Sequence, residues 1–231
     1  MIHKKSIFLI GSIIVSQSVF AQQEKKENST SKINLDVLAS AGYTSLSGLD
    51  DDLASSDFPT ATKNMNGFNV NASGLYSIHE TSLGAPVVGL GLNYSRVVGS
   101  TSYLGVIDRK DTFSTLAIIA NAGFKFKPAE KFAIFALGNF GFGVYNDYNV
   151  DLSASLPIIA GATIGASIDP TIKNHFIYGA SLIGTYEVVQ NFSVGAGVTY
   201  NRHNFKVELN SSSEDLSANE ISANLVASYS L

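Results

Sequence analysis

The sequence predicts an all-β chain that forms an eight-stranded antiparallel up-and-down transmembrane β-barrel. Three observations predict this fold. Eight segments alternate between apolar and polar residues, the connections between them are alternately short and long, and aromatic residues gather toward the two ends of the apolar face. The composition agrees, because charged residues make up only 15% of the chain and apolar residues 45%. No apolar run after residue 21 is long enough to cross a bilayer as a helix.

Residues 1–21 have the pattern of a cleavable secretory signal peptide. Lys4 and Lys5 give a positive start, residues 7–15 an apolar core, and Ala21 a small residue at the cleavage position. An uncleaved membrane anchor is the alternative, but the apolar stretch is short for one. Residues 22–32 are polar and charged without periodicity, which predicts a flexible periplasmic leader. We therefore expect the barrel to comprise residues 33–231.

Alternation with a period of two indicates strands, because successive side chains of a strand point to opposite faces. In the first segment Ile33, Leu35 and Val37 alternate with Asn34, Asp36 and Leu38, and the same pattern recurs seven more times. The expected strands lie within residues 33–44, 68–79, 88–95, 116–126, 132–142, 176–188, 192–200 and 221–231.

The connections between these strands alternate in length. Three are short, around residues 81–85, 128–130 and 190–191, and four are long and polar, at residues 47–65, 99–111, 146–174 and 208–218. Short periplasmic turns and long extracellular loops are typical of outer-membrane barrels. A barrel must also close in lipid, because an open sheet edge would leave backbone groups unpaired. Both ends of the barrel domain are then expected on the periplasmic side.

Aromatic residues on the apolar face divide into two belts. The expected periplasmic belt contains Tyr76, Phe132, Tyr186, Phe192 and Tyr229, and the expected extracellular belt contains Tyr43, Phe68, Tyr94 and Tyr200. Membrane barrels carry such girdles at both interfaces. The alternative is a soluble lipocalin-like barrel with the apolar face inward, but its water-facing surface would normally carry more charge.

Two segments carry a resemblance to a known family. The runs Val88-Gly89-Leu90-Gly91-Leu92-Asn93-Tyr94 and Phe192-Ser193-Val194-Gly195-Ala196-Gly197-Val198-Thr199-Tyr200 resemble strands of small OmpA-like and opacity-type surface barrels. The resemblance covers residues 33–231 as a pattern. It implies outer-membrane lipid as the surroundings and the barrel-assembly machinery as a partner of the C-terminal strand. The family usually ends in an aromatic residue, whereas this sequence ends Tyr229-Ser230-Leu231. We expect the barrel domain alone, without a peptidoglycan-binding domain after the last strand.

The inward face is expected to hold a plug. Asp36, His79, Lys125 and Glu187 cluster near the periplasmic end, with asparagine and serine residues above them. An eight-stranded barrel is just wide enough for its own side chains to fill. We interpret the charges as a lysine that neutralises acidic neighbours in a low-dielectric interior. The alternative is a gate whose ion pairs exchange to open a narrow path.

Three basic residues fall on the lipid-facing side near its extracellular edge: Arg96, Arg202 and Lys206. Charge is cheap near the interface and costly at mid-membrane, and arginine pairs well with phosphate oxygens. We hypothesise that these residues contact lipopolysaccharide phosphates. The alternative is that they only extend to water.

The sequence indicates neither catalysis nor a cofactor. The chain has no cysteine, and no histidine lies in a convincing nucleophile–base–acid pattern or in a metal-ligand motif. The mildly acidic balance, −4 at neutral pH, argues against nucleic acid as a partner. We therefore expect a non-enzymatic surface protein with an envelope role, and adhesion or recognition of a host or surface ligand through its loops. A narrow channel for small or apolar solutes is the second interpretation, and a lipid-modifying barrel enzyme the third.

Overall fold

The computed structural model describes residues 34–49, 62, 64–79, 81–103, 107–156, 162–209 and 212–231. The expected signal peptide and leader lie outside these residues. Nearly all of the described chain is strand, and none of its helices is long and apolar enough to cross a membrane.

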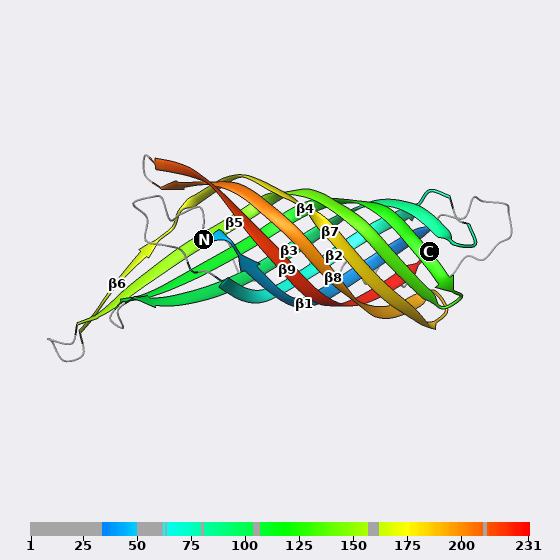
Figure 1. The fold of residues 1–231 in the computed structure, drawn as a ribbon, viewed down its shortest axis with the longest axis horizontal. Coiled ribbons are helices and arrows are strands. Elements are labelled where there is room, and N and C mark those ends of the chain that lie inside the picture. The colour runs from blue at the N-terminus through cyan, green and yellow to red at the C-terminus, as the bar shows by residue number, and fades with distance from the viewer. Residues whose placement is uncertain are drawn as a thin grey trace. The chain divides into compact units, whose positions relative to one another are not determined.

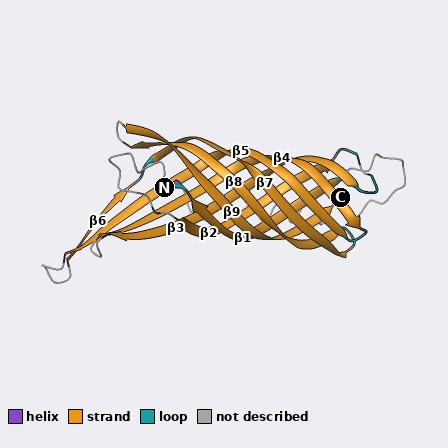
Figure 2. Cartoon of the chain, in the orientation of Figure 1, coloured by secondary structure: helices purple, strands orange, loops and turns teal. Residues whose placement is uncertain are grey.

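Nine antiparallel strands make up one sheet (Figures 1 and 2). They are β1 (Leu35–Ser47), β2 (Asn64–Ser77), β3 (Gly84–Tyr103), β4 (Ile107–Ala129), β5 (Phe132–Leu156), β6 (Ala162–Ile168), β7 (Thr171–Val189), β8 (Phe192–Leu209) and β9 (Ser212–Ser230).

The sheet closes into a ring through eight of these strands. β1 pairs with β2 on one side and with β9 on the other, and the pairing continues through β3, β4, β5, β7 and β8. β6 is not a ninth strand of the ring. It pairs only with Val150–Leu156 of β5, beyond the Phe132–Phe142 segment that pairs with β7. The eight-stranded, up-and-down prediction is confirmed.

We call the two ends of the ring the turn end and the loop end. The turn end contains the tight Glu130–Lys131 and Gln190–Asn191 turns, together with the start of β1 and the end of β9. Asn191 has a φ of 67°, in the left-handed region that asparagine tolerates in tight turns. The loop end contains the connections that the sequence predicts to be long.

At the loop end the strands run much further than predicted. Most of residues 99–111, 146–174 and 208–218, expected as loops, belong to the β3–β4, β5–β6 and β8–β9 ladders. The correction has a physical reason. The outward side chains of these extensions are polar, so the apolar outer face that indicated strands is missing there.

The two faces of the wall exchange polarity along each strand, as β8 shows. Val198 and Tyr200 point outward, but six and eight residues beyond Tyr200 the outward positions carry Lys206 and Glu208, while Phe205 and Val207 point inward and are buried. At the loop end such inward residues form one apolar core: Leu46, Leu49, Met65, Val97, Phe113, Tyr148, Val150, Phe205, Val207, Leu216 and Ala218. This end therefore has the polarity of a water-surrounded barrel.

Between the ends, the outer face is an exposed apolar band. Leu90 is 66% exposed and Leu225 77%. All nine aromatic residues predicted for the belts lie on this outer face, six of them exposed and Tyr94, Phe192 and Tyr229 half-buried. In register, Tyr43 lies opposite Phe68 toward the loop end, and Phe132 lies opposite Tyr186 at the turn end. An apolar band between two aromatic belts is the surface of a membrane-spanning barrel.

Candidate functional site

An ion pair crosses the interior near the turn end. Lys125 on β4 donates to both carboxylate oxygens of Asp36 on β1, at 2.8 and 2.7 Å, although β2 and β3 lie between these strands. Ser230 donates a third hydrogen bond to Asp36 at 2.6 Å. Both charged groups are buried, and Lys125 Nζ lies 5.4 Å from the ring centroid of Phe135. A neighbouring apolar cluster fills this level: Leu38, Leu75, Val87, Phe135, Leu137 and Val226.

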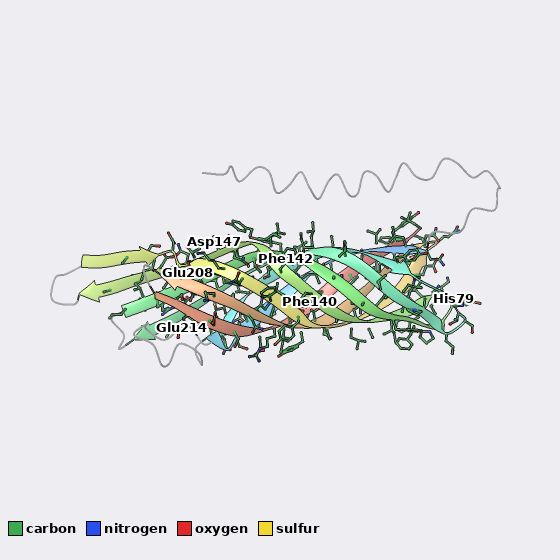
Figure 3. The ribbon with its side chains drawn as sticks, turned by 90° about the horizontal axis from the view of Figure 1, so that it is seen from above. His79, Phe140, Phe142, Asp147, Glu208 and Glu214 are labelled. Atoms are coloured by element: carbon green, nitrogen blue, oxygen red, sulfur yellow. The ribbon has the colours of Figure 1, made fainter. Side chains whose placement is uncertain are left out.

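The other two residues predicted for this plug lie elsewhere. His79 follows the end of β2 and is exposed (Figure 3), so strand alternation no longer sets its direction. Glu187 is half-buried beside a register shift, and its carboxylate accepts the Asn191 backbone N–H at 2.9 Å. His79 therefore lies past the strand and outside the predicted cluster, and Glu187 bonds to the turn rather than to the Asp36–Lys125 pair. The structure retains Asp36 and Lys125.

The middle of the lumen is a polar layer built on neighbouring strands. Asn139 donates to Ser181 at 2.8 Å and to Asn201 at 3.3 Å, and the hydroxyls of Ser181 and Thr199 lie 2.9 Å apart. Gly179 makes room here, because a Cβ at that position would lie 2.5 Å from Oδ1 of Asn201.

A row of buried polar residues crosses three adjacent strands nearer the loop end. Nε2 of His175 on β7 lies 2.9 Å from Nδ1 of His203 on β8, and Nε2 of His203 lies 3.3 Å from Oε2 of Glu220 on β9. Glu220 also accepts from Ser222 at 3.1 Å. The ring of Phe113, on β4, stands edge-on to both imidazoles. His175 lies just before residues 176–188, which the sequence predicted as a strand, so it was not expected in the lumen.

Hydrogen-bond partners indicate one tautomer in this row. Oδ1 of Asn146 accepts from Thr115 and adjoins Nδ1 of His175, and an amide oxygen only accepts, so Nδ1 of His175 carries a hydrogen. One hydrogen lies between the two imidazoles. Nε2 of His203 faces the Glu220 carboxylate at 3.3 Å, but it makes no hydrogen bond among the described residues.

A second charged pair lies beyond the belts, at the loop end. The Arg109 guanidinium grips Asp111 through Nε at 2.9 Å and through a terminal nitrogen at 2.8 Å, and Tyr148 donates to the same carboxylate at 3.0 Å. Thr62 adds its backbone N–H and hydroxyl. Burial first, and then the Asp111 carboxylate, raises the pKa of Tyr148. The phenol therefore keeps the proton that it donates. The sequence missed this cluster because residues 99–111 and 146–174 were expected to be loops.

These layers leave the described lumen filled by side chains at successive levels. Two oppositely charged pairs, Asp36–Lys125 and Arg109–Asp111, lie there, and Asn139, Ser181, Thr199 and Asn201 bond to one another. Among the described residues, no group of three or more histidine, aspartate or glutamate side chains could hold a metal ion.

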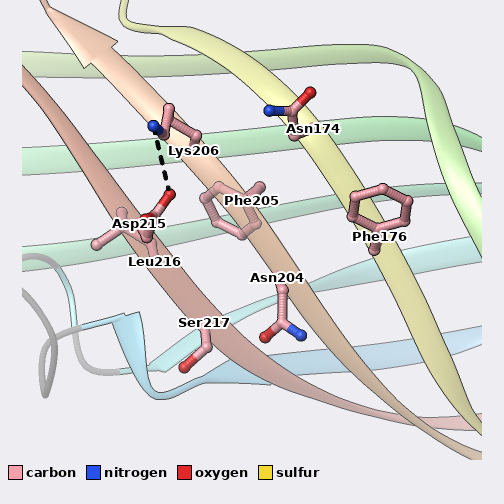
Figure 4. A pocket seen from close by; sticks show the side chains of 8 residues that line it. All are labelled: Asn174, Phe176, Asn204, Phe205, Lys206, Asp215, Leu216 and Ser217. Carbon is pink, nitrogen blue, oxygen red and sulfur yellow. Dashed lines mark ion pairs between the residues drawn. The ribbon is translucent and has the colours of Figure 1, made fainter.

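On the outer face, the structure separates the three predicted basic residues. Arg96 is exposed on β3, opposite Phe68, whereas Arg202 and Lys206 lie on β8, four strands away around the ring. Lys173 of β7, which the sequence placed in a loop, lies opposite Lys206 in register. Arg202 donates to Ser217 at 3.1 Å, and Lys206 Nζ lies 3.9 Å from Asp215. A groove of about 380 Å³ runs along these strands (Figure 4).

Known proteins resemble the chain in fold only. No family model matches it, and no curated protein matches it. Three of the solved structures that it resembles are outer-membrane proteins. The attachment invasion locus protein Ail of Yersinia pestis is 14% identical (86% of this chain, 100% of that one, TM-score 0.39). Neisserial surface protein A is 16% identical (83% and 95%, TM-score 0.41), and a major outer membrane protein of Thermus thermophilus is 12% identical (87% and 100%, TM-score 0.48).

These identities and TM-scores are too low to carry an argument about function. The described geometry by itself gives a membrane-type β-barrel whose interior holds buried side chains at each level. Toward the loop end its outer face changes from apolar to polar, and its inner face from polar to apolar.

Proposed function

We propose that this protein is a non-enzymatic surface barrel of a bacterial outer membrane, exported by the signal peptide of residues 1–21, with an envelope role. The observation that carries the proposal is the filled lumen, in which paired charges and apolar clusters alternate from the turn end to the loop end. A barrel closed in this way contributes its wall and its outer surface rather than a pore. The exposed apolar band and its belts support a position in lipid.

The same orientation gives each end a role. The turn end faces the periplasm, and β9 is the strand that the barrel-assembly machinery would engage. The loop end projects from the outer leaflet and displays the β5–β6 hairpin, which pairs along Val150–Leu156 beyond the ring. Binding sites commonly lie on elements that a rigid scaffold presents in this manner. Adhesion to a host or surface ligand through this end is the finer part of the proposal.

Single-channel recording on the refolded protein in planar bilayers tests the filled lumen. We expect at most brief, small openings in the wild type. Lys125→Ala should increase open time, because it removes the cation that closes the turn end. A large and stable conductance of the wild type would overturn the proposal.

A narrow channel is the second candidate, and one observation favours it. The Oδ1 atoms of Asn69, Asn139 and Asn224 are buried without a hydrogen-bond partner among the described residues. Such atoms would suit a file of water molecules. Uptake assays with small and apolar solutes in a deletion strain distinguish this function from a closed barrel. Lipid A mass analysis of the same strain tests the lipid-modifying enzyme.

A further inference from the structure

The groove on the outer face lies within a grid of side chains from β7, β8 and β9. Register places Lys173, Lys206 and Asp215 in one row, Phe176, Asn204 and Ser217 in the next, and Tyr178, Arg202 and Asn219 in the third. The next position of β8, Tyr200, belongs to the aromatic belt, and its hydroxyl donates to Asn219 at 2.8 Å. The grid thus begins at the belt and rises toward the loop end.

An irregularity in β7 shapes the groove. The register between β7 and β8 shifts between Lys173 and Phe176, and Asn174 within the shift has a φ of 51°. A bulge of this kind bends a strand and redirects side chains. The groove is lined by Asn174, Phe176, Asn204, Phe205, Lys206, Asp215, Leu216 and Ser217 (Figure 4). Arg202 and Lys173 lie beside it, opposite Tyr178 and Lys206 in register.

The arrangement of charges in the grid reduces the stability of the folded protein. Lys173 and Lys206 lie directly opposite each other, and like charges in that position destabilise a sheet. Glu208 holds Lys173 at 2.6 Å, but Asp215 lies 3.9 Å from Lys206, and Arg202 donates to a neutral hydroxyl, that of Ser217. Three cations face two carboxylates on a chain whose net charge is −4. An anionic ligand would offset this local excess.

The spacing of the cations indicates the size of that ligand. Arg202 and Lys206 are four residues apart on one strand, which is about 13 Å at the usual rise per residue. This is the length of a disaccharide with a phosphate at each end, and it exceeds one phospholipid headgroup. Asn174, Asn204 and Ser217, between the two cations, match sugar hydroxyls, and the aromatic belt below matches acyl chains.

We propose that this groove, together with Arg202 and Lys173 beside it, binds the bisphosphorylated disaccharide headgroup of an outer-leaflet glycolipid. Arg202 takes the phosphate nearer the belt with its planar fork, and Lys206, assisted by Lys173, takes the outer phosphate. The inference rests on the proposed outer-membrane position, since only there does the groove meet this lipid. It narrows the sequence-based hypothesis, because Arg96 stands apart from the site.

Titration of the purified, detergent-folded barrel with defined lipids, read by native mass spectrometry, tests the site. The probes are bisphosphorylated lipid A, monophosphorylated lipid A and phosphatidylglycerol. We expect the bisphosphorylated lipid to bind best, and R202E/K206E to weaken its binding about tenfold, equivalent to about 1.4 kcal/mol. R202Q/K206Q should give a smaller loss in the same order of lipids.

Arg96→Glu is the matched control, because Arg96 is an exposed cation at a comparable height on the opposite part of the wall. It should leave lipid A binding unchanged. Equal losses in Arg96→Glu and the groove variant, equal binding of phosphatidylglycerol and lipid A, or no loss in the groove variant would each overturn the site. Insertion of the wild type into bilayers is scored separately, so failure of the outer-membrane proposal is distinguishable from failure of the groove.

Discussion

Nε2 of His175 lies 2.9 Å from Nδ1 of His203, and the two rings are continued by Glu220 on the next strand. This row joins β7, β8 and β9 from the inside, at the level where the wall changes polarity. Glu220 is 1% exposed, and its carboxylate lies 3.3 Å from Nε2 of His203. The row therefore depends on all three groups together.

Glu220→Leu should destabilise the barrel by about 1–3 kcal/mol, because it leaves the buried Nε2 of His203 facing an apolar side chain and removes an acceptor from Ser222. The measurement is urea unfolding in lipid vesicles, followed by intrinsic fluorescence. Glu208→Leu is the control, since it removes a half-exposed carboxylate from its pair with Lys173, and such pairs contribute about 1 kcal/mol or less. Equal losses in the two variants would show that the buried row contributes no more than the surface pair.

The Asp36–Lys125 pair should follow the rule for buried ion pairs. Lys125→Met leaves the Asp36 carboxylate buried without its cation, and we expect a loss of about 3–5 kcal/mol of unfolding free energy. The double variant Asp36→Leu/Lys125→Met should recover most of that loss, because both desolvated charges are then gone. A double variant as unstable as the single one would show that the pair is needed for packing rather than for charge balance.

The apolar band predicts a depth-dependent cost for charge on one strand. Leu90→Arg, at the centre of the β3 outer face, should cost about 2–4 kcal/mol of stability in lipid vesicles, and Ser100→Arg, ten residues nearer the loop end, about 0–1 kcal/mol. Both side chains are exposed in the barrel. If the two substitutions cost the same, the band is not a lipid-facing surface, and the membrane proposal fails with it.

Tyr148 supports a prediction in alkaline solution. Its raised pKa means that the folded protein keeps the phenolic proton after the unfolded chain loses it, near the ordinary value of 10.0. The stabilisation is therefore complete below about pH 10 and declines as the pH rises further. Unfolding free energies measured at pH 8 and above pH 10 should fall more for the wild type than for Tyr148→Phe. A parallel fall would contradict the assignment.

Period-two alternation was enough to predict the eight barrel strands and their order, because successive side chains of a strand point to opposite faces. It failed beyond the belts, where Lys206 and Glu208 look like a loop when only the outer face is considered. The inward partners Phe205 and Val207 continue the alternation with its sign reversed, and this signal was available in the sequence.

The candidate site was predictable only in part for the same reason. Asp36 and Lys125 lie within regular strands, so the alternation of side chains predicted that both point into the lumen. His79 lies just past the end of a strand, where this alternation no longer sets the direction of a side chain. Arg109 was missed because residues 99–111 were expected to be a loop, and His175 lies between the expected loop 146–174 and the expected strand 176–188. The Lys173–Lys206 juxtaposition lies beside a bulge that no local pattern indicates.

The change of polarity along the wall also determines what another molecule meets at the loop end. Much of the surface offered there is backbone ladder held by an apolar core, so its shape is a property of the folded barrel. Antibodies or receptors that recognise it would contact side chains from neighbouring strands, and these residues lie far apart in the sequence. Linear peptides copied from residues 99–111 or 208–218 would not reproduce that surface, and a vaccine or binder aimed at it would have to present the barrel whole.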